Sequence, residues 1–210
     1  MSYPMGEDRS FASESAMVSP GRVVAWRRWR LCPDPSGLPL LGSAHEHHIW
    51  SSRTLQANCD PSRTWSYRLA FGDDDSHEAP APGCRCGIYA YSTAEWARPM
   101  GPGVWAHGRV LMGGPMFLTD NGYRAREATI DGPLGLTIEC VGGDDLYSPT
   151  RCFESPVMVK HDTKTYFPVC SKHHNAPVHV AVDGSRTIGE FLEAAAFLAV
   201  QLETFISTSN

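Results

Sequence analysis

The stretch Cys59–Ala90 decides how the chain folds, and its core reads His77-Glu-Ala-Pro-Ala-Pro-Gly-Cys84-Arg-Cys86-Gly-Ile-Tyr-Ala. Three thiols and one imidazole fall within it, and the prolines and glycine before Cys84 bend the backbone so that side chains can converge. Thiolates and imidazoles are the donors that zinc prefers, and four of them complete a closed tetrahedral site. The sequence therefore predicts a structural zinc site formed by Cys59, His77, Cys84 and Cys86.

Two other interpretations of this stretch stay open. Cys84 and Cys86 can alternate on a strand, so that one of them is a buried thiol without a metal. A catalytic zinc would instead leave one ligand position for water and need a general base, which Glu78 could supply.

A second, weaker group of the same donors lies further along the chain. Cys170 is followed three residues later by His173, with His174 beside it, and Cys-x-x-His is a good pair of zinc ligands. Cys140 and Cys152 lie in loops upstream. The sequence predicts a second zinc site from Cys140, Cys152, Cys170 and His173 or His174, against the alternative of buried cysteines and exposed histidines.

Composition places the chain among folded globular proteins. Of its 210 residues, 42% are hydrophobic and 20% are charged, which is close to the globular average. The formal net charge of −5 argues against a main surface that binds nucleic acid or an anionic membrane. No window approaches the roughly 18 apolar residues of a membrane span, so no membrane contact is expected.

Cysteine usage points to a reducing compartment. Seven cysteines cannot all pair with one another, and clustered cysteines in a reducing compartment bind metal more often than they form disulfides. The first residues also lack the apolar run of a signal peptide. We therefore expect a cytoplasmic protein.

Strand patterns dominate the chain. β-Branched and aromatic runs, separated by turn residues such as Gly113-Gly-Pro and Asp120-Asn-Gly, predict strands over 22–31, 38–42, 55–59, 87–91, 104–112, 122–130, 134–141, 157–160, 166–169 and 177–182. Capping-box spacing predicts a short helix after Ser92 and an amphipathic helix after Thr187. The predicted fold class is α+β: mainly antiparallel β, with a C-terminal amphipathic helix and zinc-stapled loops.

Residues 1–20 differ in composition from the rest of the chain. They are rich in Ser, Glu, Met and Gly and offer few large apolar side chains for burial. Such a segment cannot offset the entropy that it loses on ordering. We predict a disordered arm over 1–20 and a single β-rich α+β domain over 21–206.

The first predicted strand carries the run Trp26-Arg-Arg-Trp-Arg30. Arg28 and Arg30 could bind phosphates while the tryptophans stack on bases. The favoured interpretation is that the arginine stems cover apolar surface beside a core strand. Nucleic acid therefore stays an alternative partner.

An enzymatic alternative depends on four residues of the middle third, Arg109, Tyr123, Arg124 and Glu127. Together they could hold a phosphate- or carboxylate-bearing substrate next to a carboxylate base. A solvated sheet face accounts for the same four residues. The histidines, acids and serines form no recognisable triad or dyad, so no catalytic residue is predicted.

Three motifs accompany His77-Glu-Ala-Pro: Cys84-Arg-Cys-Gly-Ile-Tyr-Ala, Gly108-Arg-Val-Leu-Met-Gly-Gly and Gly122-Tyr-Arg-Ala-Arg-Glu-Ala. With them the chain resembles, from Trp26 to Glu127, a group of uncharacterised proteins from actinobacteria and their bacteriophages. The resemblance implies an intracellular bacterial or phage setting and no activity. We therefore expect a zinc-stabilised module for protein–protein interaction, of the kind that a phage accessory protein uses to engage a host protein.

Overall fold

The computed structural model describes residues 14–18, 21–43, 49–59, 77–98, 101–141, 152, 154–173 and 184–196. Antiparallel strands make up most of these residues, and a helix over 188–196 follows the last strand. The predicted fold class, mainly antiparallel β with a C-terminal helix, is confirmed.

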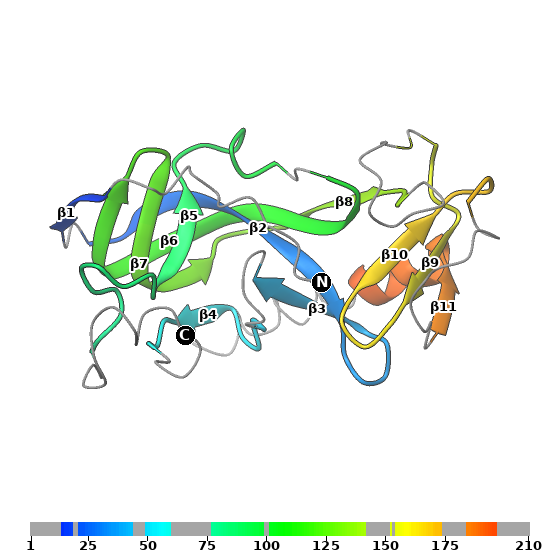
Figure 1. Cartoon of the computed structure of the whole chain (residues 1–210), viewed down its shortest axis with the longest axis horizontal. Coiled ribbons are helices and arrows are strands. Elements are labelled where there is room, and N and C mark those ends of the chain that lie inside the picture. The colour runs from blue at the N-terminus through cyan, green and yellow to red at the C-terminus, as the bar shows by residue number, and fades with distance from the viewer. Residues whose placement is uncertain are drawn as a thin grey trace. The chain divides into compact units, whose positions relative to one another are not determined.

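The strands form two sheets (Figure 1). The larger has the order β1-β6-β2-β5-β7-β4, with β3 beside β2 and β8 beside β6. Its members are β1 (Glu14–Val18), β2 (Val23–Pro33), β3 (Pro39–Ser43), β4 (Thr54–Gln56), β5 (Ile88–Tyr91), β6 (Gly103–Thr119), β7 (Gly122–Ile130) and β8 (Gly135–Glu139). The smaller has the order β10-β9-β11 and consists of β9 (Met158–His161), β10 (Tyr166–Val169) and β11 (Gly184–Thr187).

The chain forms two compact units. The single domain over 21–206 stays a prediction. Of the described residues, the first unit contains those within Met1–Arg27, Thr54–Ala97 and Arg109–Gly132. The second contains those within Arg28–Arg53, Arg98–Gly108 and Pro133–Asn210. Each unit therefore draws on segments that are distant in sequence, which a reading of composition along the chain does not reveal.

β7 is the central strand of the first unit. It pairs with β6 along one edge and with β5 and β4 along the other. β5 in turn pairs with β2, and β2 with β6, so these four strands close a ring. Both edges of β7 are paired, so its backbone is held by hydrogen bonds on each side. The side chains that project from β7 therefore start from a fixed backbone.

The β6–β7 hairpin differs in part from the prediction. Asp120 and Asn121 form the expected turn, since Thr119 pairs with Gly122. Gly113-Gly-Pro was predicted as a turn, but it lies within β6, where the register shifts. Gly114 has a φ of 72°, in the left-handed region that favours glycine, so this segment forms a bulge without reversing the chain.

β1 lies inside the range predicted as a disordered arm. It pairs antiparallel with β6, so that Met17 stands opposite Phe117, although 56% of Met17 is exposed. A strand at a sheet edge forms through backbone hydrogen bonds and does not need a buried face. Residues 1–13 and 19–20 of the predicted arm lie outside the described part of the chain.

The helix predicted after Ser92 is absent from the described residues 92–98, which form turns. The N–H and the hydroxyl of Ser92 both donate to the carbonyl of Asn121, at 2.8 and 3.1 Å. The hydroxyl is therefore not available to cap a helix, and the proline at position 99 leaves little length for one.

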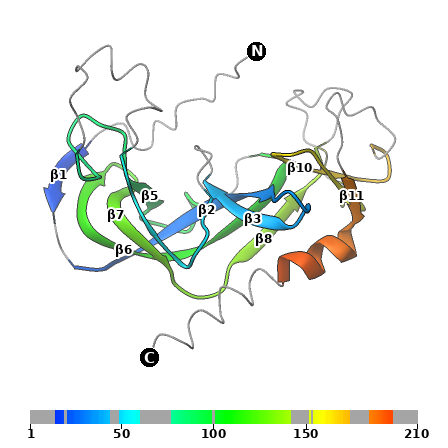
Figure 2. The same cartoon turned by 90° about the horizontal axis from the view of Figure 1, so that it is seen from below.

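The second unit contains the smaller sheet and the C-terminal helix (Figure 2). The predicted capping box is confirmed: the N–H of Thr187 donates to the Glu190 carboxylate at 2.8 Å, and the N–H of Glu190 donates to the Thr187 hydroxyl at 3.3 Å. Phe191 packs edge-on against Tyr166 of β10, with ring centroids 4.9 Å apart, which fixes the helix against the sheet. The strand predicted over 177–182 lies outside the described residues.

Candidate metal centres

The first unit brings together Cys59, His77, Cys84 and Cys86, which we call the first cluster. Their ligand atoms all lie within 4.8 Å of one another. The sulfurs of Cys59 and Cys84 are 3.8 Å apart, and Nε2 of His77 is 3.2 Å from the sulfur of Cys86. Four donors that converge in this way can hold a metal ion.

The distance between the sulfurs of Cys59 and Cys84 matches a tetrahedral metal site better than a disulfide. With metal–sulfur bonds of about 2.3 Å, two sulfurs of a tetrahedral zinc site lie about 3.8 Å apart. A disulfide would require about 2.05 Å. All seven cysteines are described and none is in a disulfide, so the thiols of the cluster are reduced and face one another.

β7 and its neighbours hold the segments that carry these ligands. The N–H of Ala57, two residues before Cys59, donates to the carbonyl of Arg126 at 2.7 Å. The guanidinium of Arg126 pairs with both carboxylate oxygens of Glu78, at 2.9 and 3.4 Å, next to His77. Glu78 is therefore engaged by an arginine, in an ion pair that is largely exposed to solvent.

Arg124, the other arginine on this face of β7, supports the turn that contains Cys84. Its guanidinium donates to the carbonyl of Cys86 and, at 3.1 Å, to the carbonyl of Ala81. The side chain is fully buried, and its guanidinium carbon lies 4.5 Å from the centre of the Phe117 ring. The buried guanidinium of Arg124 therefore holds this loop through two hydrogen bonds to its backbone.

Gly87 makes room for that guanidinium. A Cβ at this position would lie 2.7 Å from Cγ of Arg124 and 3.3 Å from Cβ of Pro80. The φ of Gly87 is also 130°, where side chains are strained. Next to it, the N–H of Cys86 donates to the sulfur of Cys84 at 3.4 Å.

The protonation state of the first cluster depends on a cation. Burial, followed by the hydrogen bond with Cys84, raises the pKa of the Cys86 thiol to about 12. The Cys86 thiol therefore keeps its proton near neutral pH when no cation is present. Metal binding must displace this proton, and a divalent cation supplies the charge that stabilises the thiolate.

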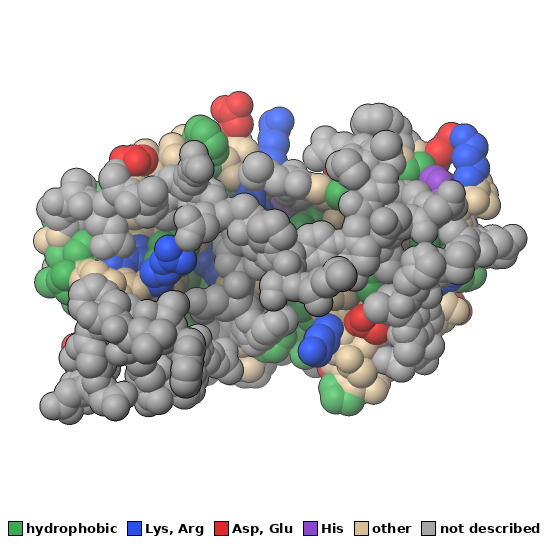
Figure 3. Space-filling model, in the orientation of Figure 1, with side chains coloured by type: hydrophobic (Ala, Val, Ile, Leu, Met, Phe, Trp, Pro, Cys, Tyr) green, Lys and Arg blue, Asp and Glu red, His purple; other side chains and the backbone are tan. Residues whose placement is uncertain are grey.

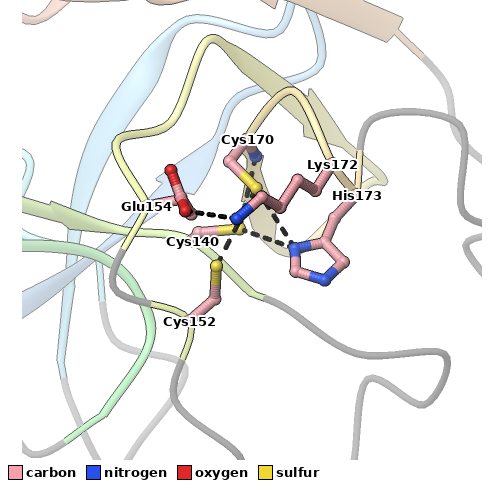
Figure 4. A network of polar contacts seen from close by, with 6 residues as sticks. All are labelled: Cys140, Cys152, Glu154, Cys170, Lys172 and His173. Atoms are coloured by element: carbon pink, nitrogen blue, oxygen red, sulfur yellow. Dashed lines mark hydrogen bonds and ion pairs between the residues drawn. The ribbon is translucent and has the colours of Figure 1, made fainter.

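The second unit brings together Cys140, Cys152, Cys170 and His173, which we call the second cluster. Figure 4 shows their thiols and imidazole pointing toward one another. Nδ1 of His173 lies 3.2 Å from the sulfur of Cys170 and 3.6 Å from that of Cys140, and the sulfurs of Cys152 and Cys170 are 3.8 Å apart. This group can also hold a metal ion, and His174, its other predicted candidate, lies outside the described residues.

Backbone amides assist the second cluster. The N–H of Cys170 donates to the sulfur of Cys140 at 3.2 Å. Burial acts to raise the pKa of Cys170, but hydrogen bonds from the N–H groups of His173 and Lys172 outweigh it and lower the pKa to about 7. Burial raises the pKa of Cys140 to about 12, although the Cys170 amide partly offsets it. Cys170 is therefore more ready than Cys140 to lose its proton and bind a cation.

An exposed ion pair borders the second cluster. Lys172 pairs with Glu154, and Figure 4 draws this ion pair together with the second cluster. Glu154 is the main cause of the raised pKa of Lys172, with smaller contributions from Cys152 and Cys170. Both partners are largely exposed, so solvent screens the pair.

The arginines predicted to bind phosphate lie on β2. Arg28 is only 6% exposed and donates to the carbonyl of Arg98 at 3.0 Å, while Arg30 is half-buried. Trp29 is fully buried and meets Trp50 edge-on at 5.3 Å. On the face drawn in Figure 3, the visible Lys and Arg side chains form small separate groups. This arrangement fits arginine stems that cover a core strand better than a phosphate-binding surface.

The four residues of the enzymatic alternative take part in separate contacts. Arg109 is bound to Asp131, with 2.9 Å between the guanidinium and the carboxylate. Arg124 is buried beneath the first cluster. Tyr123 and Glu127 project from the opposite face of β7, because their positions differ from that of Arg124 by an odd number. The described structure thus does not gather these residues into one pocket.

No family model, curated protein or solved structure matches the chain. Among the described residues, no helix has the length and apolar character needed to cross a bilayer. Inferences about function therefore depend on the two clusters and their surroundings.

Proposed function

We propose that the protein is a zinc-stabilised interaction module in which each compact unit is held together by its own zinc ion. The observation that carries the proposal is the convergence, in each unit, of three thiols and one imidazole to within 4.8 Å. Soft sulfur donors favour zinc over magnesium or calcium, which bind oxygen.

A structural role fits these donors better than a catalytic one. Three cysteines and one histidine fill all four positions of a tetrahedral ion and leave none for water. Glu78, the acid next to the first cluster, is paired with Arg126. The zinc ions would therefore hold loops in place and would not activate a nucleophile.

The setting that we propose is the cytoplasm of a bacterium, with the protein acting as a bacteriophage or actinobacterial accessory factor on a host protein. Seven reduced cysteines support a reducing compartment. The burial of Arg28 counts against its use in binding the phosphates of a nucleic acid. A tight, salt-sensitive mobility shift with DNA or RNA would favour the nucleic-acid alternative.

Metal content tests the proposal directly. We expect protein purified without added metal to contain two zinc ions per chain by elemental analysis. Removal with a strong chelator should unfold both units, because ligand convergence and metal binding are coupled. A folded, metal-free protein would rule the proposal out.

A further inference from the structure

We propose that Arg124 is the positioning residue of the first cluster: it sets the backbone of the Cys84–Cys86 turn and so controls how tightly that cluster binds zinc. The inference depends on the proposed zinc binding. It concerns a residue whose side chain donates hydrogen bonds to the backbone carbonyls of Ala81 and Cys86.

The contacts of Arg124 bracket the turn. One end of its guanidinium donates to the carbonyl of Ala81, before Cys84, and the other to the carbonyl of Cys86, after it. The N–H of Cys84 in turn donates to that same Ala81 carbonyl at 3.2 Å. Fixing both ends of so short a segment limits the positions that two of the three thiols can take, so the donors are held together before the ion arrives.

Charge gives Arg124 a second role. Three thiolates, a neutral imidazole and one zinc ion carry a net charge of about −1. A fully buried guanidinium near that site favours the charged state, because charges interact more strongly where water is excluded.

Gly87 and Phe117 keep the guanidinium in place. The space that Gly87 leaves open is filled by the Arg124 side chain, and the Phe117 ring lies against the guanidinium at 4.5 Å. Phe117 stands directly opposite Arg124 in the β6–β7 pairing. The guanidinium is thus held between the loop and the sheet, and this fixes the directions of its hydrogen bonds to Ala81 and Cys86.

Arg126 offers a matched control. It lies two residues along β7 on the same face and also contacts the loop, through Glu78. Its side chain is 41% exposed and that of Glu78 is 78% exposed. An ion pair in water contributes little to stability. Arg126 therefore has the charge of Arg124 and lies near the same loop, but its side chain is not buried and its hydrogen bonds go to the Glu78 carboxylate.

The experiment measures zinc affinity at each cluster in the full-length chain. Wild type, Arg124→Met, Arg124→Lys and Arg126→Met are titrated with a chelator. Alkylation of the released cysteines, read by mass spectrometry, reports the first cluster through Cys84 and Cys86 and the second through Cys140 and Cys170. The second cluster serves as the reference within each molecule.

We expect Arg124→Met to weaken zinc binding at the first cluster about 10- to 100-fold and to leave the second cluster unchanged. Arg126→Met should weaken it less than about fivefold. Arg124→Lys keeps the charge but not the forked donors, and should lose about tenfold. If Arg124→Met does not fold, the lysine variant carries the same test.

Three results would overturn the inference. One is that the Arg124 variants bind zinc at the first cluster as tightly as the wild type does. The second is an equal loss at both clusters, which would indicate a general effect on the fold. If the wild type binds no zinc at the first cluster, the proposed function fails there and the inference fails with it.

Discussion

The first cluster lies over β7, where the buried guanidinium of Arg124 donates to the loop that carries Cys84 and Cys86, whereas the second cluster is bordered by the exposed pair Lys172–Glu154. Both clusters have three thiols and one imidazole. In both clusters a backbone N–H of one ligand donates to the sulfur of another. The first cluster has, in addition, hydrogen bonds from the buried Arg124 side chain of β7 to its loop. The same donor set can thus be held by two kinds of support.

The largest expected effect comes from removing one ligand of either cluster. Cys84→Ser and Cys170→Ser should each reduce zinc content from two to one per chain. Structural zinc binding is worth about 10–16 kcal/mol, which is comparable with the whole stability of a domain, so the unit that loses its ion should unfold. Hydrogen exchange, read for each unit, measures this.

Cys32→Ser is the control, since Cys32 belongs to neither cluster. It should retain both zinc ions. If Cys84→Ser exposed the amides of both units equally, the clusters would not act on separate units and the comparison would fail.

Gly87→Ala should have the next largest effect. The added Cβ meets Arg124 at 2.7 Å in a backbone conformation with φ of 130°, and each strained residue costs about 1–3 kcal/mol. Gly83→Ala is matched to it, because Gly83 also has positive φ, 74°, but open space around it. Thermal unfolding should show a larger loss for Gly87→Ala. Equal losses would mean that contact with Arg124 adds nothing.

Thr187→Ala tests the second unit without touching a ligand. Loss of this cap should destabilise the helix by about 1 kcal/mol, measured by urea unfolding. Ser185→Ala, at an exposed position of β11, is the control and should have almost no effect. Zinc content should stay at two per chain. Loss of the second ion would show that the cluster depends on the helix.

The smallest effect is expected from Lys172→Met. Its partner Glu154 and Lys172 itself are exposed, so breaking the pair should leave stability almost unchanged and should change zinc affinity at the second cluster by less than about fivefold. Chelator competition measures the affinity. A change as large as that expected for Arg124→Met would remove the contrast between buried and exposed support.

The sequence predicted the antiparallel strands, the Thr187 cap and the grouping of both clusters, because turn residues, capping boxes and clustered thiols are local signals. It did not predict the role of Arg124. Nothing in Gly122-Tyr-Arg-Ala-Arg indicates that one arginine is buried beneath a loop some forty residues earlier in the chain, as its bond to Ala81 requires.

The division into two units could not be predicted from local sequence signals either. β2 and β6 each run from one unit into the other, so no linker or change of composition marks the boundary. The strand β1 was missed for a related reason: its order comes from pairing with β6, which lies a hundred residues later, and its own side chains carry little of that information.

X-ray absorption at the zinc edge of the purified full-length chain tests the central claim most directly. Two sites of three cysteines and one histidine predict an average first shell of three sulfurs at about 2.3 Å and one nitrogen at about 2.0–2.1 Å. That shell, with two zinc ions per chain, is the expected result. A shell made mainly of oxygen or nitrogen at about 2.0–2.2 Å, or protein that folds without zinc, would contradict it.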